Sequence, residues 1–224
     1  MHIPDGYLSP QTYIPLFVAS AAIIGVAVRK VKKQMTTKLV PFLGMSAAFA
    51  FLIMMFNLPI PGGTSGHAVG GALIALLFGP WVAMISVSVA LMIQAFVFGD
   101  GGITALGANC FNMAIVLPFL AYGIFKLVSG KSKNPGRMNI AAFLSGYLSL
   151  SVVSFVTAFE FGIQPIIASS PNGTPLFAPY PLKIAIPAMV IEHLILFSII
   201  EGIITVLLFR YFYKNNKELI EVLK

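Results

Sequence analysis

The stretch HAVGGALIALLFGPW, residues 67–81, sets how often this chain can cross a membrane. Its apolar part, from His67 to Gly79, has 13 residues, and a helix of that length reaches about 20 Å, whereas the hydrocarbon core of a bilayer is about 30 Å thick. Gly79 and Pro80 are typical of a tight turn that ends a helix. The stretch therefore either joins residues 81–98 in one long span or forms a separate short helix.

The composition is that of an integral membrane protein. Hydrophobic residues make up 58% of the 224 residues, charged residues make up 9%, and the mean hydropathy is +0.93. Soluble globular domains contain about 25% charged residues. We predict an all-α protein with a single transmembrane domain over residues 1–224, which begins with a tail over residues 1–11. The expected helices are the apolar runs at about 12–28, 39–57, 67–79, 81–98, 103–125, 138–159 and 182–209.

The basic residues decide between six and seven crossings. Thirteen of the fourteen fall in three clusters between or after the apolar runs, and only Lys183 lies elsewhere. The clusters consist of Arg29, Lys30, Lys32, Lys33 and Lys38; Lys126, Lys131, Lys133 and Arg137; and Arg210, Lys214, Lys217 and Lys224. Because cytoplasmic loops are enriched in Lys and Arg, all three clusters should lie on one side. Only a turn at residues 79–81 allows this, so we predict a seven-helix bundle with its amino terminus outside and its carboxyl terminus in the cytoplasm. The positive net charge thus reports topology, and nucleic acid is not an expected partner.

The third helix is too short to span a bilayer alone, so we expect it to be buried in protein and to open into a cavity. Nothing basic precedes the first span, which is unlike a secretory leader, and Met1 is therefore expected to be retained on the outer side. The single cysteine, Cys110, excludes an internal disulfide or a cysteine metal cluster. Any metal site must use nitrogen or oxygen.

The first two residues of MHIPDGYLSP form a chelating unit. The Met1 amine and the His2 amide nitrogen close a five-membered ring on a metal, and the same amide with the His2 Nδ1 closes a six-membered ring. His67, on the same outer face, can supply a fourth nitrogen. A square-planar set of nitrogens suits Ni(II) or Cu(II) better than Zn, Mg or Ca. The competing interpretation is that His2 is a spectator on a solvated tail.

Other polar residues leave alternatives open. Asp5 either supports the metal ligands through a hydrogen bond or is a solvated turn residue. Gly66 and Gly70 form a GxxxG pattern, which indicates close helix packing or admits the tail beside His67. Ionisable groups inside a membrane span are costly and usually functional. Three lie in the seventh run: Glu192, His193 and Glu201. For Glu192 and His193 the roles left open are groups that support the metal ligands, a proton path or a polar clamp between helices, and a direct ligand role is weighed for His193.

The sequences MHIPDGYLS at the amino terminus and SGHAVGGALIALLFGP at residues 65–80 resemble the CbiM/NikM family. Members of that family are the substrate-binding S components of energy-coupling factor (ECF) transporters for nickel and cobalt. The resemblance covers the whole chain. It implies that Met1, through its amine, and His2, through its backbone and imidazole nitrogens, bind the ion together with His67.

The resemblance also implies partners. They are a transmembrane T component, cytoplasmic ATPase subunits that supply the energy, and a small accessory membrane subunit, in the cell membrane of a prokaryote. Small residues on the second helix suit docking to a T component, or packing within the chain: Gly44 with Ala48, or Ser46 with Ala50. The chain itself is then no enzyme. Four planar nitrogens favour Ni(II) as the transported substrate, with Co(II) as the alternative.

Two other functions remain open at this point. A vitamin-binding S component would share the architecture but would be indifferent to the amino terminus. A membrane enzyme would need an acid and a base, for which Glu192 and His193 are the candidates. Packing without chemistry is the remaining interpretation. Metal binding through the tail predicts that one residue added before Met1 abolishes binding, because the first chelate ring is lost.

Overall fold

The structure is a computed structural model that describes residues 1–34, 39–60 and 64–215. Lys38, Lys217 and Lys224 of the basic clusters lie outside the described residues. The α-helices are α1 (Pro10–Gln34), α2 (Leu39–Met54), α3 (Gly71–Phe78), α4 (Pro80–Ile93), α5 (Leu106–Asn109), α6 (Leu117–Ser129), α7 (Pro135–Gly162), α8 (Gln164–Ile167), α9 (Leu182–Glu192) and α10 (Ser198–Asn215). Three π-helical turns are η1 (Gln94–Phe98), η2 (Cys110–Val116) and η3 (His193–Phe197), and two short strands are β1 (Leu58–Ile60) and β2 (Thr64–Gly66).

The π-helical turn η1 extends α4 at its carboxyl end, whereas η2 joins α5 to α6 and η3 joins α9 to α10. They produce the long helical segments Pro80–Phe98, Leu106–Ser129 and Leu182–Asn215. With Pro10–Lys33 and Pro135–Ile167, five helices in the described part of the chain are long and apolar enough to cross a membrane. Large apolar side chains such as Leu127 and Phe56 are exposed on the outside of the bundle. This surface suits lipid, as expected of a multi-pass membrane protein.

The third predicted helix begins later than the hydropathy indicates. We expected a helix over residues 67–79, but α3 starts at Gly71, and residues 67–70 form an irregular connection after β2. Gly70, the residue before α3, has a φ of +74°. This left-handed conformation costs little for glycine, because glycine has no Cβ. As expected, α3 is buried, and the chain turns at Gly79 (φ +87°) into Pro80, the first residue of α4. His67 is thus on a buried loop, not on a helix.

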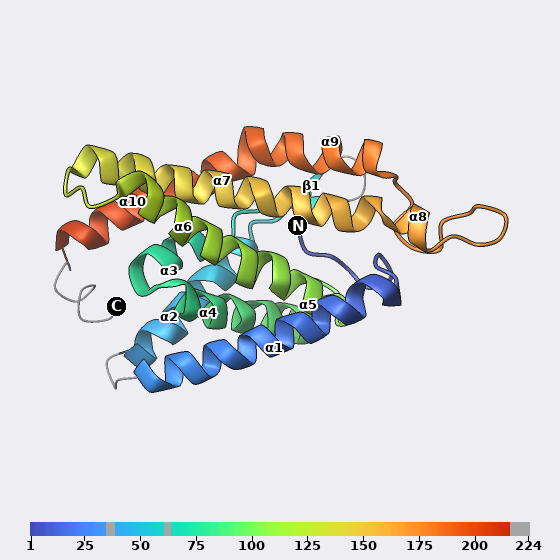
Figure 1. Ribbon diagram of the computed structural model, residues 1–224, viewed down its shortest axis with the longest axis horizontal. Helices are drawn as coiled ribbons and strands as arrows, with labels where there is room; N and C mark the ends of the chain where they lie inside the picture. Colours follow the sequence, from blue (N-terminus) through green and yellow to red (C-terminus); the bar gives the residue numbers. More distant parts are fainter. Residues whose placement is uncertain (35–38, 61–63, 216–224) are drawn as a thin grey trace.

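The described residues of the basic clusters lie at one end of the bundle. Figure 1 shows the carboxyl end of α1, the connection from α6 to α7 and the carboxyl end of α10 on the same side. The long connection between α8 and α9 lies at the opposite end. The amino terminus is at neither end, because the tail runs from α1 back into the middle of the bundle beside α7 (Figure 1). The tail therefore belongs to the interior of the fold.

Candidate metal site

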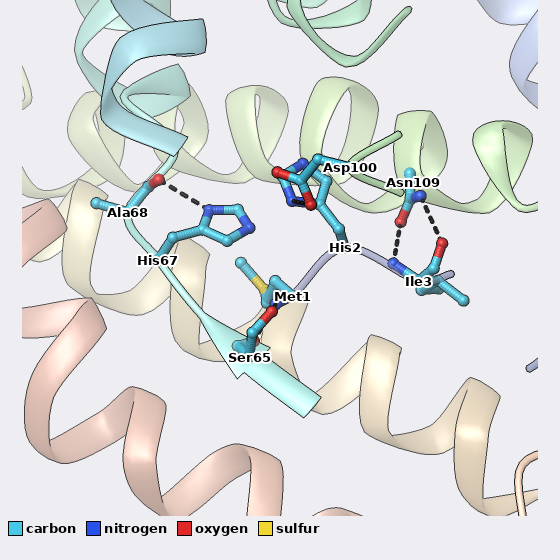
Figure 2. Close-up of polar contacts among 8 residues, drawn as sticks. All are labelled: Met1, His2, Ile3, Ser65, His67, Ala68, Asp100 and Asn109. Carbon is cyan, nitrogen blue, oxygen red and sulfur yellow. Dashed lines mark hydrogen bonds and ion pairs between the residues drawn. The ribbon is translucent and has the colours of Figure 1, made fainter. Parts of the chain in front are cut away.

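The first three residues are buried, which is unusual for the start of a chain. Met1 is 1% exposed, His2 6% and Ile3 0%. Asn109, the last residue of α5, forms two hydrogen bonds with the backbone of Ile3, as a neighbouring strand would (Figure 2). The Ile3 N–H donates to Asn109 Oδ1 at 2.9 Å, and Asn109 Nδ2 donates to the Ile3 carbonyl at 3.1 Å. The same carbonyl accepts the Gly102 N–H at 2.8 Å. These bonds fix the register of the tail and so the place of His2.

Asp5 anchors the next part of the tail. Its carboxylate accepts hydrogen bonds from the backbone N–H of Ile103 (3.1 Å) and of Thr104 (2.8 Å). These contacts, with the Thr104 hydroxyl first among them, lower the pKa of the Asp5 carboxyl. The carboxylate is therefore engaged with the loop after η1. We expected Asp5 either beside the metal ligands or free in solvent, and the structure places it in this loop contact.

His67 approaches the tail from the other side. The hairpin of β1 and β2 pairs Leu58 with Gly66 and leads the chain to His67. The Met1 amino group donates a hydrogen bond to the Ser65 carbonyl (Figure 2). The imidazoles of His2 and His67 stack, with ring centroids 4.5 Å apart and an interplanar angle of 23°. The structure thus brings together the amine and both imidazoles that the sequence singled out.

Hydrogen bonding leaves a free nitrogen on each imidazole. The Nδ1 of His67 lies 3.0 Å from the Ala68 carbonyl, which can only accept, so we assign the ring proton to Nδ1. Its Nε2 is buried and has no hydrogen-bond partner among the described residues. Both ring nitrogens of His2 are in the same situation, although Nδ1 lies 3.4 Å from Asp100 Oδ1. Buried polar atoms without partners are rare and indicate a site for a ligand.

Burial also keeps these groups uncharged. It lowers the pKa of the Met1 amino group from 8.0 to about 5, against the opposing effect of Asp100. It lowers the pKa of His2 from 6.5 to about 3, helped by the nearby amino group. The pKa of His67 is held well below 6.5, again mainly by burial and then by His2. At neutral pH the amine and both imidazoles are therefore neutral, and each has a lone pair for a cation.

A cavity of about 260 Å³ opens onto this cluster. It is lined by His2, Pro4, Ser65, Gly99, Asp100, Gly101 and Phe161. The Asp100 side chain is 28% exposed, and burial raises the pKa of its carboxyl while the amino terminus opposes this rise. Asp100 therefore lies at the mouth of the site, between solvent and His2.

Side chains alone do not make a metal site here. In residues 1–34, 39–60 and 64–215, no three side chains of His, Cys, Asp or Glu gather closely enough to hold a metal ion. The other nitrogens beside the two imidazoles belong to the main chain: the buried amine of Met1 and the amide of His2.

Of the ionisable residues in the seventh run, His193 lies behind the His67 loop. The Nδ1 of His193 is 2.7 Å from the Met189 carbonyl, and its ring packs on Phe197 at a centroid distance of 5.1 Å. The Phe197 ring in turn fills the space where a Cβ on Gly66 would lie, 2.0 Å from that position. Glycine at position 66 therefore serves close packing. Glu192 is half-buried at the end of α9.

Glu201 has a structural role that the sequence left undefined. Its fully buried carboxylate accepts hydrogen bonds from the N–H groups of Val69 (2.8 Å), Gly70 (2.9 Å) and Ala72 (3.4 Å). These are donors of the His67 loop and of the first turn of α3, so Glu201 ties both to α10. A carboxylate inside an apolar run was the only signal of this role. The positions of Asn109, Asp100 and Gln94 beside the amino-terminal tail had no corresponding signal in the sequence.

The small residues of α2 fall into two groups. Gly44 and Ala48 are exposed, whereas Ser46 is 5% exposed and Ala50 0%. Ser46 and Ala50 pack inside the chain and are not available to a partner in this structure. Of these four small residues, only Gly44 and Ala48 lie on the surface of the chain.

Comparison with known proteins gives relatives over nearly the whole chain. The fused nickel transport protein NikMN of Rhodobacter capsulatus is 46% identical over 221 residues, which are 98% of this chain and 64% of that protein. The probable fused nickel transport protein LarMN of Lactiplantibacillus plantarum is 47% identical over 213 residues, 94% of this chain and 64% of that protein. This chain thus spans a little less than two thirds of the length of both relatives.

A solved structure described as a transition metal transporter has the same fold. Its TM-score is 0.93 at 47% sequence identity, over 99% of this chain and 96% of that chain. The family model of the cobalt uptake substrate-specific transmembrane region, CbiM, matches residues 2–219. The chain therefore belongs to the CbiM family.

Proposed function

We propose that this protein is the S component of an ATP-driven ECF importer and binds nickel as its transported substrate. In this proposal the ion has four nitrogen ligands: the Met1 amine, the His2 amide, the His2 Nδ1 and the His67 Nε2. The observation that carries the proposal is the burial of the amino terminus, 1% exposed at Met1, against two stacked imidazoles with unpaired nitrogens. Neither a vitamin-binding pocket nor an acid-base catalyst requires such a buried amino terminus.

The hydrogen bonds around the cluster suit this ligand set. A neutral amine has N–H groups and one lone pair, so it can donate to the Ser65 carbonyl and still bind a metal. The His67 Nδ1 is committed to the Ala68 carbonyl, which leaves Nε2 as the donor atom to the ion. Metal binding replaces the stacking of the two rings by coordination to a common centre.

The charges also suit a divalent ion. Chelation by the His2 amide nitrogen removes its proton and adds one negative charge, so a bound Ni(II) site retains one positive charge. A buried unpaired charge is costly. The Asp100 carboxylate, whose Oδ1 lies 3.4 Å from the His2 Nδ1, can offset it. Strong-field planar nitrogens favour Ni(II), and Co(II) is the second candidate because the matching family model is described by cobalt uptake.

The wider assembly follows from the same proposal. The basic end of the bundle faces the cytoplasm of a prokaryotic cell, and the ion enters from the opposite side through the cavity beside Asp100. Separate ATPase subunits, a T component and a small accessory membrane subunit provide energy and release. The exposed pair Gly44 and Ala48 on α2 is the proposed docking position for the T component.

The test is titration of the purified protein with Ni(II) and with Co(II), after amino-terminal sequencing has verified a free Met1. We expect tight Ni(II) binding with one ion per chain and a large loss of affinity in His67→Ala. His193→Ala is the matched control, since His193 is equally buried but its ring packs on Phe197, whereas the ring of His67 stacks on His2. Binding that is lost in His193→Ala but kept in His67→Ala would contradict the proposed ligands.

A further inference from the structure

Gln94 is a buried amide whose side chain lacks hydrogen bonds to the described residues. It is 0% exposed, and neither its Nε2 nor its Oε1 has a partner. A buried amide in this state is costly, because water can no longer satisfy it. Gln94 is also the first residue of η1, and π-helical turns within α-helices frequently occur at functional sites. Both features indicate that this side chain serves a state of the protein with a bound ligand.

Gln94 lies next to His2. Its backbone carbonyl accepts the N–H of Asp100 at 3.0 Å and the N–H of Gly99, so residues 99–101 fold back over it. This turn contacts the imidazole: Asp100 Oδ1 lies 3.4 Å from Nδ1, and a Cβ on Gly101 would lie 3.6 Å from Cδ2, the carbon bonded to Nε2. The Gln94 amide is near enough to raise the pKa of His2, although neither His2 nitrogen meets hydrogen-bond geometry with it.

Chelation by His2 dictates where its ring proton lies. The six-membered ring with the His2 amide uses Nδ1, so a neutral imidazole must carry its proton on Nε2. Metal-binding histidines almost always donate the other ring N–H to a carbonyl or carboxylate. For His67 the Ala68 carbonyl fills this role at 3.0 Å. The corresponding acceptor for His2 has to be a buried oxygen beside Nε2.

We propose that Gln94 is a positioning residue, whose Oε1 accepts the Nε2–H hydrogen bond of His2 when Nδ1 binds the metal. This inference rests on the proposed function, because it assumes chelation through Nδ1. Gln94 does not touch the ion. It fixes the tautomer and the ring orientation of His2, and it satisfies a proton that would otherwise be buried without an acceptor.

The experiment uses ¹⁵N-histidine-labelled protein loaded with Ni(II). Four planar nitrogens give a diamagnetic nickel complex, so ring N–H signals can be recorded by nuclear magnetic resonance. The chain has three histidines, and His193→Asn identifies the signal of His193. In the wild type we expect a His2 Nε2–H proton that exchanges slowly and resonates downfield. A fast-exchanging Nε2–H overturns the inference without any change at Gln94.

Substitution then tests Gln94 itself. Gln94→Leu should move the His2 Nε2–H signal upfield and lower Ni(II) affinity by about 10-fold to 100-fold, the range for groups that orient metal ligands. Gln94→Glu keeps an acceptor oxygen and should restore the signal and most of the affinity. Gln164→Leu is the matched control, because Gln164 is equally buried but binds the Ser9 N–H and Thr12. It should change the melting temperature and leave the His2 signal in place.

The outcomes separate the two proposals. An unchanged His2 signal and affinity in Gln94→Leu would overturn the role of Gln94 while the ligand set stands. A wild-type protein that binds no nickel, or whose nickel complex is paramagnetic, would overturn the proposed function, and the role of Gln94 with it.

Discussion

Asn109 holds the backbone of Ile3 through both atoms of its side-chain amide, at 2.9 and 3.1 Å. The partners lie far apart in the sequence, and neither supplies a proposed ligand. Their contact nevertheless sets the position of the adjacent His2. The tail therefore enters the bundle as an ordered, strand-like segment. The anchored backbone of Ile3 sets the positions of the nitrogen atoms of Met1 and His2, which precede it.

Replacing Asn109 by Ala should weaken nickel binding without unfolding the protein. The substitution removes two buried hydrogen bonds, each of which typically contributes about 1 kcal/mol, so the tail becomes free to leave the site. We expect an affinity at least about tenfold lower by calorimetric titration. Ser145→Ala is the control, because the Ser145 hydroxyl donates to the Ala141 carbonyl of its own helix. Equal affinities in the two variants would show that the clamp is irrelevant to the site.

Glu201→Leu should lower both stability and metal affinity. The substitution leaves three N–H groups around the His67 loop without an acceptor, at a cost on the order of 3 kcal/mol or more. We expect a lower melting temperature in detergent and weaker Ni(II) binding. Thr205→Val, one turn further along α10 and equally buried, should affect stability less and binding little. Wild-type affinity in Glu201→Leu would mean that the loop does not depend on α10.

Nickel affinity should depend on pH near neutrality through the release of a single proton. The Met1 amine, with its pKa lowered to about 5, and His2, lowered to about 3, carry no proton there, so only the His2 amide releases one. The logarithm of the affinity should rise by about one per pH unit from about pH 6 to 8. It should fall more steeply as the pH drops through 5, where the amine also binds a proton. A slope of about two throughout the neutral range would indicate an amine with its ordinary pKa.

Asp100→Asn should reduce nickel affinity by about tenfold or more, because the residual positive charge of the bound site loses its partner. The loss should persist at high salt, since the contact with His2 is half-buried. Glu192→Gln removes a half-buried carboxylate at the end of α9 and serves as the control. Affinity that falls equally in both variants would indicate a general effect of net charge.

The apolar runs read from the sequence fall largely within helices of the structure, because hydropathy is a local property of the sequence, whereas seven crossings and their direction stay predictions. The start of α3 was wrong by four residues, since Gly70 and the Glu201 carboxylate, which belongs to another helix, set it. The chelating pair Met1 and His2 was readable because its donors are adjacent in the chain. The hydrogen bonds that hold this pair and the His67 loop in place could not be predicted. The bonds from Ile3 to Asn109 and from Val69 to Glu201 join residues 106 and 132 positions apart. Pairings over such separations leave no trace in one sequence.

The most decisive measurement is nickel binding by a variant with one alanine placed before Met1. The extra residue moves the free amine away from the His2 amide and removes the five-membered chelate ring, while both imidazoles remain. An alanine inserted in the exposed loop between Asn172 and Gly173 is the matched control. We predict that the control binds Ni(II) as the wild type does and that the extended protein folds but does not bind it tightly. Tight binding by the extended protein would contradict the tail chelate.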